Sequence, residues 1–342
     1  MDADSFAFQR VTESWRLYAA GELDAAILEA QQASAGGRPS NQALAALGFF
    51  LIQAGRDDEA ADVLFPALEH APAYAPLHWY AGYLYQRRSD AAAAAAAFQR
   101  ACELDDSLDE AAYALAWVLH DLGRIEEAAD WAAHAIAQRK LPQRWMQMGW
   151  LQQKRELHAS AVQAYREAIT AFHSAAPEQP RLHLHLAQCL QAVQDVDGAE
   201  AVLRQALDQW PLNAELVAEA VRRCWKRGDW QGAKRLARDL VQAQPSRGDS
   251  WLLLGATLQD MGELQEADEA LANAHELDPG LIDAMFRRAQ IQRGWERFVG
   301  ARWLLEMVLD QAPDHAIAQD LMAQVLLDLG ETLAARRVLV RR

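Results

Sequence analysis

The sequence lacks the features on which most enzymes and membrane proteins depend. It has three cysteines among 342 residues and no apolar run long enough to span a bilayer. It contains no glycine-rich phosphate loop, no Cys-x-x-Cys pair and no His-Glu-x-x-His motif. These absences predict a chain that is not itself an enzyme, binds no metal or organic cofactor and does not insert into a membrane.

Positive charge is scarce as well. The chain has 33 Lys and Arg against 48 Asp and Glu, a formal net charge of −15. Because nucleic-acid-binding surfaces are usually basic, this balance argues against a nucleic-acid partner. The opening segment MDADSFAFQR has neither the basic nor the apolar part of a signal peptide, so we expect a cytoplasmic location.

The few potential metal ligands are poorly placed. Cys102, Cys189 and Cys224 are far apart and lie within helical patterns, which indicates buried free thiols in a reducing compartment. His183 and His185 are two residues apart, so on a helix their side chains would point about 200° apart. That separation prevents them from sharing one ion.

What the chain has in abundance is helical periodicity. Val-, Ile- and Thr-rich alternating runs are absent, so no strands are expected. The clearest segment is 248–281, in which Gly262 is expected to break the helix and Pro279 to end it. Apolar residues recur at helical spacing on both sides of that break: Trp251, Leu254 and Leu258, then Ala267, Leu271 and Ala274. This pattern predicts a helical hairpin.

The hairpin pattern recurs along the chain with a period of about 34 residues, which is typical of tetratricopeptide repeats. The chain resembles that family, and in particular its long bacterial arrays, from end to end. The resemblance implies an all-α, right-handed superhelix, or α-solenoid, of about ten hairpins. Nine of the ten expected units begin near these residues: Ala7, Asn41, Ala75, Asp109, Pro142, Ala214, Gly248, Ile282 and Ala316.

The regularity is interrupted once. Residues 173–180, HSAAPEQP, lengthen one connection, so we expect an N-terminal array over 1–172, an insertion over 173–180 and a C-terminal array over 181–342. The last unit ends at Arg342 without a polar capping helix. We therefore expect that the natural protein continues or that this end docks on something else, including a second copy of the chain.

An aromatic pattern marks the predicted first helices of units one to five. The ninth place of these units holds Trp15, Phe49, Tyr83, Trp117 and Trp150, and the place one turn earlier holds Val11, Ala45, Trp79, Tyr113 and Met146. The resemblance implies that first helices line the concave groove. We therefore predict a ligand-binding groove lined by eight residues, named here the aromatic strip: Trp15, Phe49, Trp79, Tyr83, Tyr113, Trp117, Met146 and Trp150.

Two interpretations of the strip remain open. The side chains can pack between neighbouring first helices and show only their edges. Alternatively, they form a surface for a protein, a peptide or a glycan, because exposed aromatic surface of this extent usually has a partner. Protein or peptide is the preferred ligand class.

Beyond unit five the same places become polar. Unit seven is unusually basic, and Arg222 and Lys226 lie one helical turn apart where they are expected to face the groove. Arg287 and Arg293 of unit nine extend the predicted basic contact. The cluster is either a solvated face balanced by acids on adjacent units, or a clamp for an acidic segment.

The predicted function is therefore a non-catalytic scaffold that holds a protein or peptide in its groove. An alternative follows from the resemblance, because bacterial arrays of this family often precede a glycosyltransferase, methyltransferase or sulfotransferase domain. In that case the repeats would select the substrate or set the oligomeric state of an enzyme whose catalytic domain lies beyond Arg342.

Overall fold

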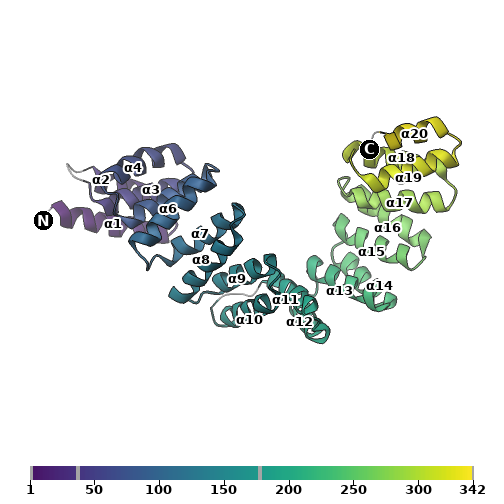
Figure 1. The fold of residues 1–342 in the computed structure, drawn as a ribbon, viewed down its shortest axis with the longest axis horizontal. Coiled ribbons are helices and arrows are strands. Elements are labelled where there is room, and N and C mark those ends of the chain that lie inside the picture. The colour runs from purple at the N-terminus through teal and green to yellow at the C-terminus, as the bar shows by residue number, and fades with distance from the viewer. Residues whose placement is uncertain (1–2, 36–38, 176–178, 341–342) are drawn as a thin grey trace. The chain divides into compact units, whose positions relative to one another are not determined.

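The protein is built from helices alone. The computed structural model describes residues 3–35, 39–175 and 179–340, and these residues form twenty α-helices and no strand (Figure 1). Consecutive helices of the described residues pack in pairs as helical hairpins, from α1 with α2 to α9 with α10 and from α13 with α14 to α19 with α20, which makes the chain a helical solenoid. The predicted all-α class and repeat architecture are confirmed, and the right-handed superhelix stays a prediction.

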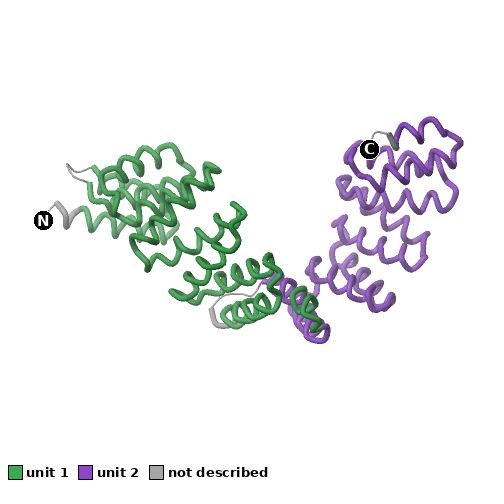
Figure 2. The backbone as a smooth tube through the Cα atoms, viewed as in Figure 1, with its two compact units in different colours: residues 1–178, 188–195 green, residues 179–187, 196–342 purple. Residues whose placement is uncertain are grey.

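The helices belong to two compact units, residues 1–178 with 188–195 and residues 179–187 with 196–342 (Figure 2). The first unit contains the following helices: α1 (Ala3–Ala19), α2 (Leu23–Ser34), α3 (Asn41–Gln53), α4 (Asp57–His70), α5 (Ala75–Arg87), α6 (Ala91–Leu104), α7 (Asp109–Asp121), α8 (Ile125–Gln138), α9 (Pro142–Lys154) and α10 (His158–Ala175). Helix α11 (Pro180–Ala192) is shared between the units.

The second unit contains the remaining helices: α12 (Val196–Gln209), α13 (Ala214–Arg227), α14 (Trp230–Ala243), α15 (Gly248–Asp260), α16 (Leu264–Leu277), α17 (Ile282–Gly294), α18 (Phe298–Gln311), α19 (Ala316–Asp328) and α20 (Thr332–Val340). The odd-numbered helices are the first helices of the hairpins. Among these, α15 packs against α17 and α17 against α19, as α1 packs against α3 and α3 against α5 in the first unit.

The predicted insertion 173–180 is described only in part. Helix α10, the second helix of its hairpin, continues through residue 175. It is 18 residues long, whereas the second helices of most hairpins have 14. Residues 176–178 lie outside the described residues, as does Arg342, on which the prediction of an uncapped end depends.

Each hairpin turns at one residue with a left-handed backbone. The ten residues in this conformation recur at the same repeat place: Gly21, Gly55, Ser89, Gly123, Glu156, Gln194, Gly228, Gly262, Glu296 and Gly330. Glycine adopts this conformation without steric cost, whereas other residues are strained there. The helix break predicted at Gly262 is confirmed, and its φ is 81°.

A second glycine lets the two helices of a hairpin cross closely. A Cβ atom on Gly82 would lie 2.6 Å from the Phe98 ring, and one on Gly255 would lie 2.6 Å from Leu271. Gly48 stands in the same relation to Leu64. The leucine or phenylalanine of the second helix therefore fills the space that a side chain on the first helix would need.

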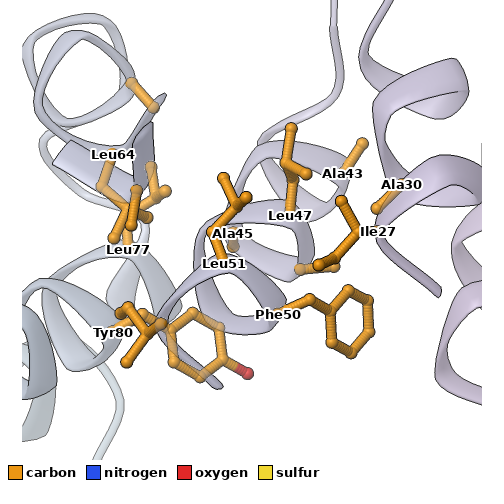
Figure 3. Close-up of a cluster of buried hydrophobic side chains, with 14 of the residues drawn as sticks. Ile27, Ala30, Ala43, Ala45, Leu47, Phe50, Leu51, Leu64, Leu77 and Tyr80 are labelled. Atoms are coloured by element: carbon orange, nitrogen blue, oxygen red, sulfur yellow. The ribbon is translucent and has the colours of Figure 1, made fainter. Parts of the chain in front are cut away.

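Large apolar residues beside these crossings form the cores. In the first unit one core extends from α1 to α5 and includes Phe50, Leu64 and Leu77, all fully buried (Figure 3). The next core extends from α5 to α9. The second unit has comparable cores around Leu271 and Leu305. Each hairpin thus buries its apolar face only against its neighbours, as expected of a repeat array.

One buried ion pair ties three helices of the first unit together. The Arg144 guanidinium is 1% exposed and lies 2.6 Å from an Asp109 carboxylate oxygen. It also donates hydrogen bonds to the carbonyl oxygens of Ala135 and Arg139, at 2.9 and 3.1 Å. A buried charge needs such partners, because desolvation alone is strongly unfavourable. This pair therefore joins α9 to α7 and to the end of α8.

The three cysteines are buried free thiols, as predicted. Burial raises the pKa of Cys102 to about 12 and that of Cys189 to about 11. The thiolate is the reactive form of cysteine, so these side chains are poor nucleophiles near neutral pH. None of the helices in the described part of the chain is both long and apolar enough to cross a bilayer.

Candidate functional site

The aromatic strip lies on five successive first helices of the first unit. Trp15 is on α1, Phe49 on α3, Trp79 and Tyr83 on α5, Tyr113 and Trp117 on α7, and Met146 and Trp150 on α9. All eight side chains are half-buried, neither enclosed in a core nor fully exposed. Part of every side chain is therefore accessible to a ligand, although each also packs against the array.

The rings at the start of the strip contact one another across helices. Trp15 stacks on Phe49 with ring centroids 5.2 Å apart, and Phe49 contacts Tyr80 at 5.1 Å. Tyr80 in turn stacks on Trp79 at 4.8 Å. Such geometries stabilise aromatic pairs beyond the area that they bury. The rings therefore hold α1, α3 and α5 together in addition to presenting their surface.

The far part of the strip is built around Trp117. This indole lies 6.4 Å from the Tyr113 ring and 5.3 Å from the Trp150 ring. His120 meets Trp150 edge-on at 4.1 Å, and the Lys154 ammonium lies 5.3 Å from the same indole. Trp117 therefore packs mainly on other half-buried rings. The polar groups of His120 and Lys154 lie beside this aromatic surface on α7 and α9.

A small hollow opens beside Tyr83. It has a volume of about 240 Å³ and is lined by Ile52, Gln53, Tyr83, Gln86 and Arg87 of α3 and α5. Arg87 is held by Asp57, with Nε 2.8 Å from a carboxylate oxygen. Burial raises the pKa of the Tyr83 hydroxyl, which therefore stays protonated and able to donate a hydrogen bond.

In the first two repeats, the place one helical turn before the strip residue is not exposed as predicted. Val11 and Ala45 are 1% and 3% exposed, so this place belongs to the core there. Conversely, the sequence reasoning missed Tyr18 and Tyr80, which contact Phe49 although they occupy other repeat places. The signal that could have identified them is an aromatic residue close in sequence to Trp15 or Trp79.

The four residues of the predicted basic contact differ in whether an acid already pairs with them. Arg287 lies 3.1 Å from Asp283 and donates to Gln259, and Arg293 lies 2.8 Å from Asp328 and donates to Gln324. The exposed Arg222 is paired with Glu219 at 2.9 Å. Among the described residues, Lys226 has no ion-pair partner within 4 Å.

Four further basic residues of the seventh repeat are neutralised. Arg223 is buried, bonds Glu219 and donates to the Ala187 carbonyl oxygen. Three more pair with acids on neighbouring hairpins: Arg227 with Glu200, Lys234 with Glu263, and Arg238 with Glu266. This geometry favours the interpretation of a basic face balanced by adjacent acids over that of a clamp.

No arrangement for metal or nucleophilic chemistry is evident. Among the described residues, no group of three His, Cys, Asp or Glu side chains is placed to hold a metal ion. What the array offers is surface: half-buried rings in the first unit and paired charges in the second.

Comparison with protein families bears on three parts of the chain. Models described as tetratricopeptide repeat match residues 81–143, 159–224 and 248–280. Together with the stacked hairpins of each unit, these matches decide the family. The chain is an array of tetratricopeptide repeats. The family points to a protein-interaction scaffold.

Several solved structures are similar to this array, and one of them, Tom70, shares its fold. Yeast Tom70 is 13% identical, with a TM-score of 0.54, over 98% of this chain and 91% of that one. A thermophilic tetratricopeptide protein from Thermus thermophilus is 18% identical over 54% of this chain and 99% of its own, with a TM-score of 0.43. MamA is 18% identical over 47% of this chain and 87% of its own, with a TM-score of 0.41. None of the curated proteins compared with the array matches it in sequence.

Proposed function

We propose that the aromatic strip of the first unit is the recognition surface of this scaffold, and that it binds an apolar segment of a protein partner. The observation that supports this most is the half-burial of all eight strip residues on five consecutive first helices. Half-buried rings are pre-ordered by their neighbours, so binding would cost little side-chain entropy. Their remaining surface would be desolvated by the partner.

A protein or peptide suits the strip better than an ionic small molecule. Between Trp15 and Tyr113 the strip itself carries no charge, and Arg87 beside it is already neutralised by Asp57. Aromatic side chains such as Trp and Tyr are enriched among the residues that dominate protein interfaces. The hollow beside Tyr83 has room for one apolar side chain of such a partner.

The test is quantitative capture of partners from an extract of the source cells, with identification by mass spectrometry. The bait proteins are the wild type, a Tyr83→Ala/Trp117→Ala variant and a matched Arg222→Ala/Gln290→Ala variant with equivalent changes in the second unit. We expect a defined partner to be lost only from the strip variant. Retention of every partner by that variant would reject the proposal.

A further inference from the structure

The outer face of α18 carries two exposed apolar side chains. Val299 and Trp303 are 74% and 57% exposed, and their i,i+4 spacing places them on one side of the helix. Leu333 of α20 is 72% exposed and occupies the repeat place of Val299 in the next hairpin. Single exposed apolar residues are ordinary on protein surfaces, so the surroundings of these three decide whether they mark an interface.

An apolar hollow lies beside Trp303, between α18, α19 and α20 at the C-terminal end of the second unit (Figure 1). It has a volume of about 310 Å³, and its apolar lining comes from Leu309, Met322, Leu326, Ala334 and Val338. Arg302, the residue next to Trp303, lines the hollow, whereas Trp303 itself does not. The molecule therefore presents a large exposed ring beside an apolar space that the ring does not fill.

Charged side chains of both signs complete the lining of this hollow. Arg302 and Glu306 already pair with each other at 2.8 Å. Asp310 and Arg337 are exposed, and neither has an ion-pair partner within 4 Å in the described part of the chain. With two bases and two acids the lining has no net charge, although the whole chain carries −15. Two copies of this acidic chain would therefore repel each other less at this face than at an acidic one.

These features are self-complementary, as a two-fold contact between identical chains requires. In such a contact the same face must offer both a protruding group and the space that receives it. Trp303 and the hollow meet this condition for packing, and Asp310 and Arg337 meet it for charge. A partner of different sequence would not need both halves on one face, so the arrangement favours a second copy.

We propose that a second copy of this chain docks on α18 and α20 through a two-fold contact. Trp303 of each copy would enter the hollow of the other, and Asp310 of each copy would pair with Arg337 of the other. Val299 and Leu333 would lie at the edge of the contact. This surface is separate from the aromatic strip and does not depend on the function proposed for it. Because the contact is small, the expected dimer is weak, with a Kd on the order of 10 µM.

Sedimentation velocity over about 1–200 µM protein, a range that includes this Kd, measures the association. The wild type should shift from monomer to dimer. Trp303→Ser should weaken the dimer at least about 10-fold, because aromatic side chains in interface pockets dominate binding. The matched control is Trp230→Ser, which removes an exposed indole of α14 outside the hollow and should dimerise like the wild type. Circular dichroism verifies that each variant is folded.

Charge exchange at the edge of the hollow tests the two-fold pairing directly. Arg337→Asp alone would place two acids opposite each other, and Asp310→Arg alone would place two bases, so each should weaken the dimer about 10-fold. An equimolar mixture of the two variants should recover association, because every Asp then meets an Arg of the other variant. Repulsion by overall charge alone would instead make Asp310→Arg associate more tightly than the wild type.

Four results would overturn the proposal. The first is a wild type that stays monomeric throughout this concentration range, and the second is a Trp303→Ser variant that dimerises like the wild type. The third is a charge-exchange mixture that associates no better than either variant alone. Finally, a Trp117→Ala variant that loses the dimer would place the contact on the aromatic strip instead.

Discussion

At the ninth repeat place, units one to five carry Trp15, Phe49, Tyr83, Trp117 and Trp150, whereas units seven to ten carry Arg222, Ala256, Gln290 and Gln324. The frame around these places is the same in both regions. Gly48 and Gly255 make equivalent close crossings, and Gly55 and Gly262 make equivalent left-handed turns. The frame thus depends on small and turn-forming residues, so the residue at the ninth repeat place can vary without changing the fold.

Charged side chains are accommodated in two ways, which differ in how far the guanidinium is enclosed. In the first unit Arg144 is enclosed, and its charge is satisfied by Asp109 and two carbonyl oxygens. Arg223 of the second unit is buried as well. Arg287 and Arg293 of the second unit are instead partly solvated and pair on the surface. The following predictions compare an enclosed pair with a solvated one.

The largest effect is expected from removing the buried guanidinium. Arg144→Met removes the buried partner of the Asp109 carboxylate, which keeps only the exposed Arg139 at 3.1 Å. It should lower the free energy of unfolding by about 3 kcal/mol, the lower end of the range for a broken buried pair. The equivalent Arg287→Met in the second unit should cost less than about 1 kcal/mol, because that pair is solvated. Urea unfolding followed by circular dichroism measures both.

A further variant separates charge from packing. Asp109→Leu/Arg144→Met should recover much of the lost stability, since replacing a buried pair by apolar residues is often neutral. Equal losses of stability for Arg144→Met and Arg287→Met would contradict the difference between the enclosed and the solvated ion pair.

The turn position tests whether the frame is shared. Ser89→Gly or Glu156→Gly in the first unit should raise stability by about 1–2 kcal/mol, because each relieves a left-handed backbone at a non-glycine residue. Gly262→Ala in the second unit should lower stability by a similar amount. Thermal unfolding reports all three. Gly294→Ala is the control, because no atom lies within 4 Å of the added methyl group and its φ is not positive.

The ring contacts of the strip should be energetically coupled. A double-mutant cycle on Trp117→Ala and Trp150→Ala should give a coupling of about 0.5–1.5 kcal/mol. The corresponding cycle on Arg222→Ala and Gln290→Ala, at the same repeat place in the second unit, should be additive within about 0.5 kcal/mol. Additive Trp variants would mean that the two indoles contribute independently.

The smallest effect concerns an exposed pair in the second unit. Arg181 lies 2.7 Å from Glu215 and lowers the pKa of that carboxyl through its hydrogen bond. A lowered pKa in the folded state means that the pair stabilises the fold above pH of about 4.3 and stops doing so as pH falls. Arg181→Gln should therefore cost less than about 1 kcal/mol at pH 7, and this cost should shrink as the pH falls below about 4.3. A stability difference between the wild type and Arg181→Gln that does not change with pH would show that it does not come from the Glu215 charge.

The repeat frame could be predicted from the sequence because it depends on residue types at fixed spacing. Gly262, Gly255 and Leu271 fill the places that the hairpin requires, so a period of about 34 identifies them without any tertiary information. The burial of Val11 and Ala45 could not be predicted in this way. At this repeat place the large side chains Trp79, Tyr113 and Met146 are half-buried, whereas the small Val11 and Ala45 are covered by the residues around them.

The charge of the second unit was less predictable still. A list of basic residues suggested a cationic surface around Arg287 and Arg293. Asp283 lies one turn before Arg287 on the same helix, so this partner follows from i,i+4 spacing. Asp328, one hairpin further on than Arg293, becomes evident only when the helices are stacked.

The most direct test of the recognition surface is the Kd of a captured partner for two single variants, measured by isothermal titration calorimetry. Trp117→Ala should weaken binding by about 2 kcal/mol, roughly 30-fold, as loss of a central aromatic anchor does. Gln290→Ala, at the same repeat place in the second unit, should leave the Kd within about twofold. An unchanged Kd for Trp117→Ala, with the fold intact, would contradict the assignment of the aromatic strip.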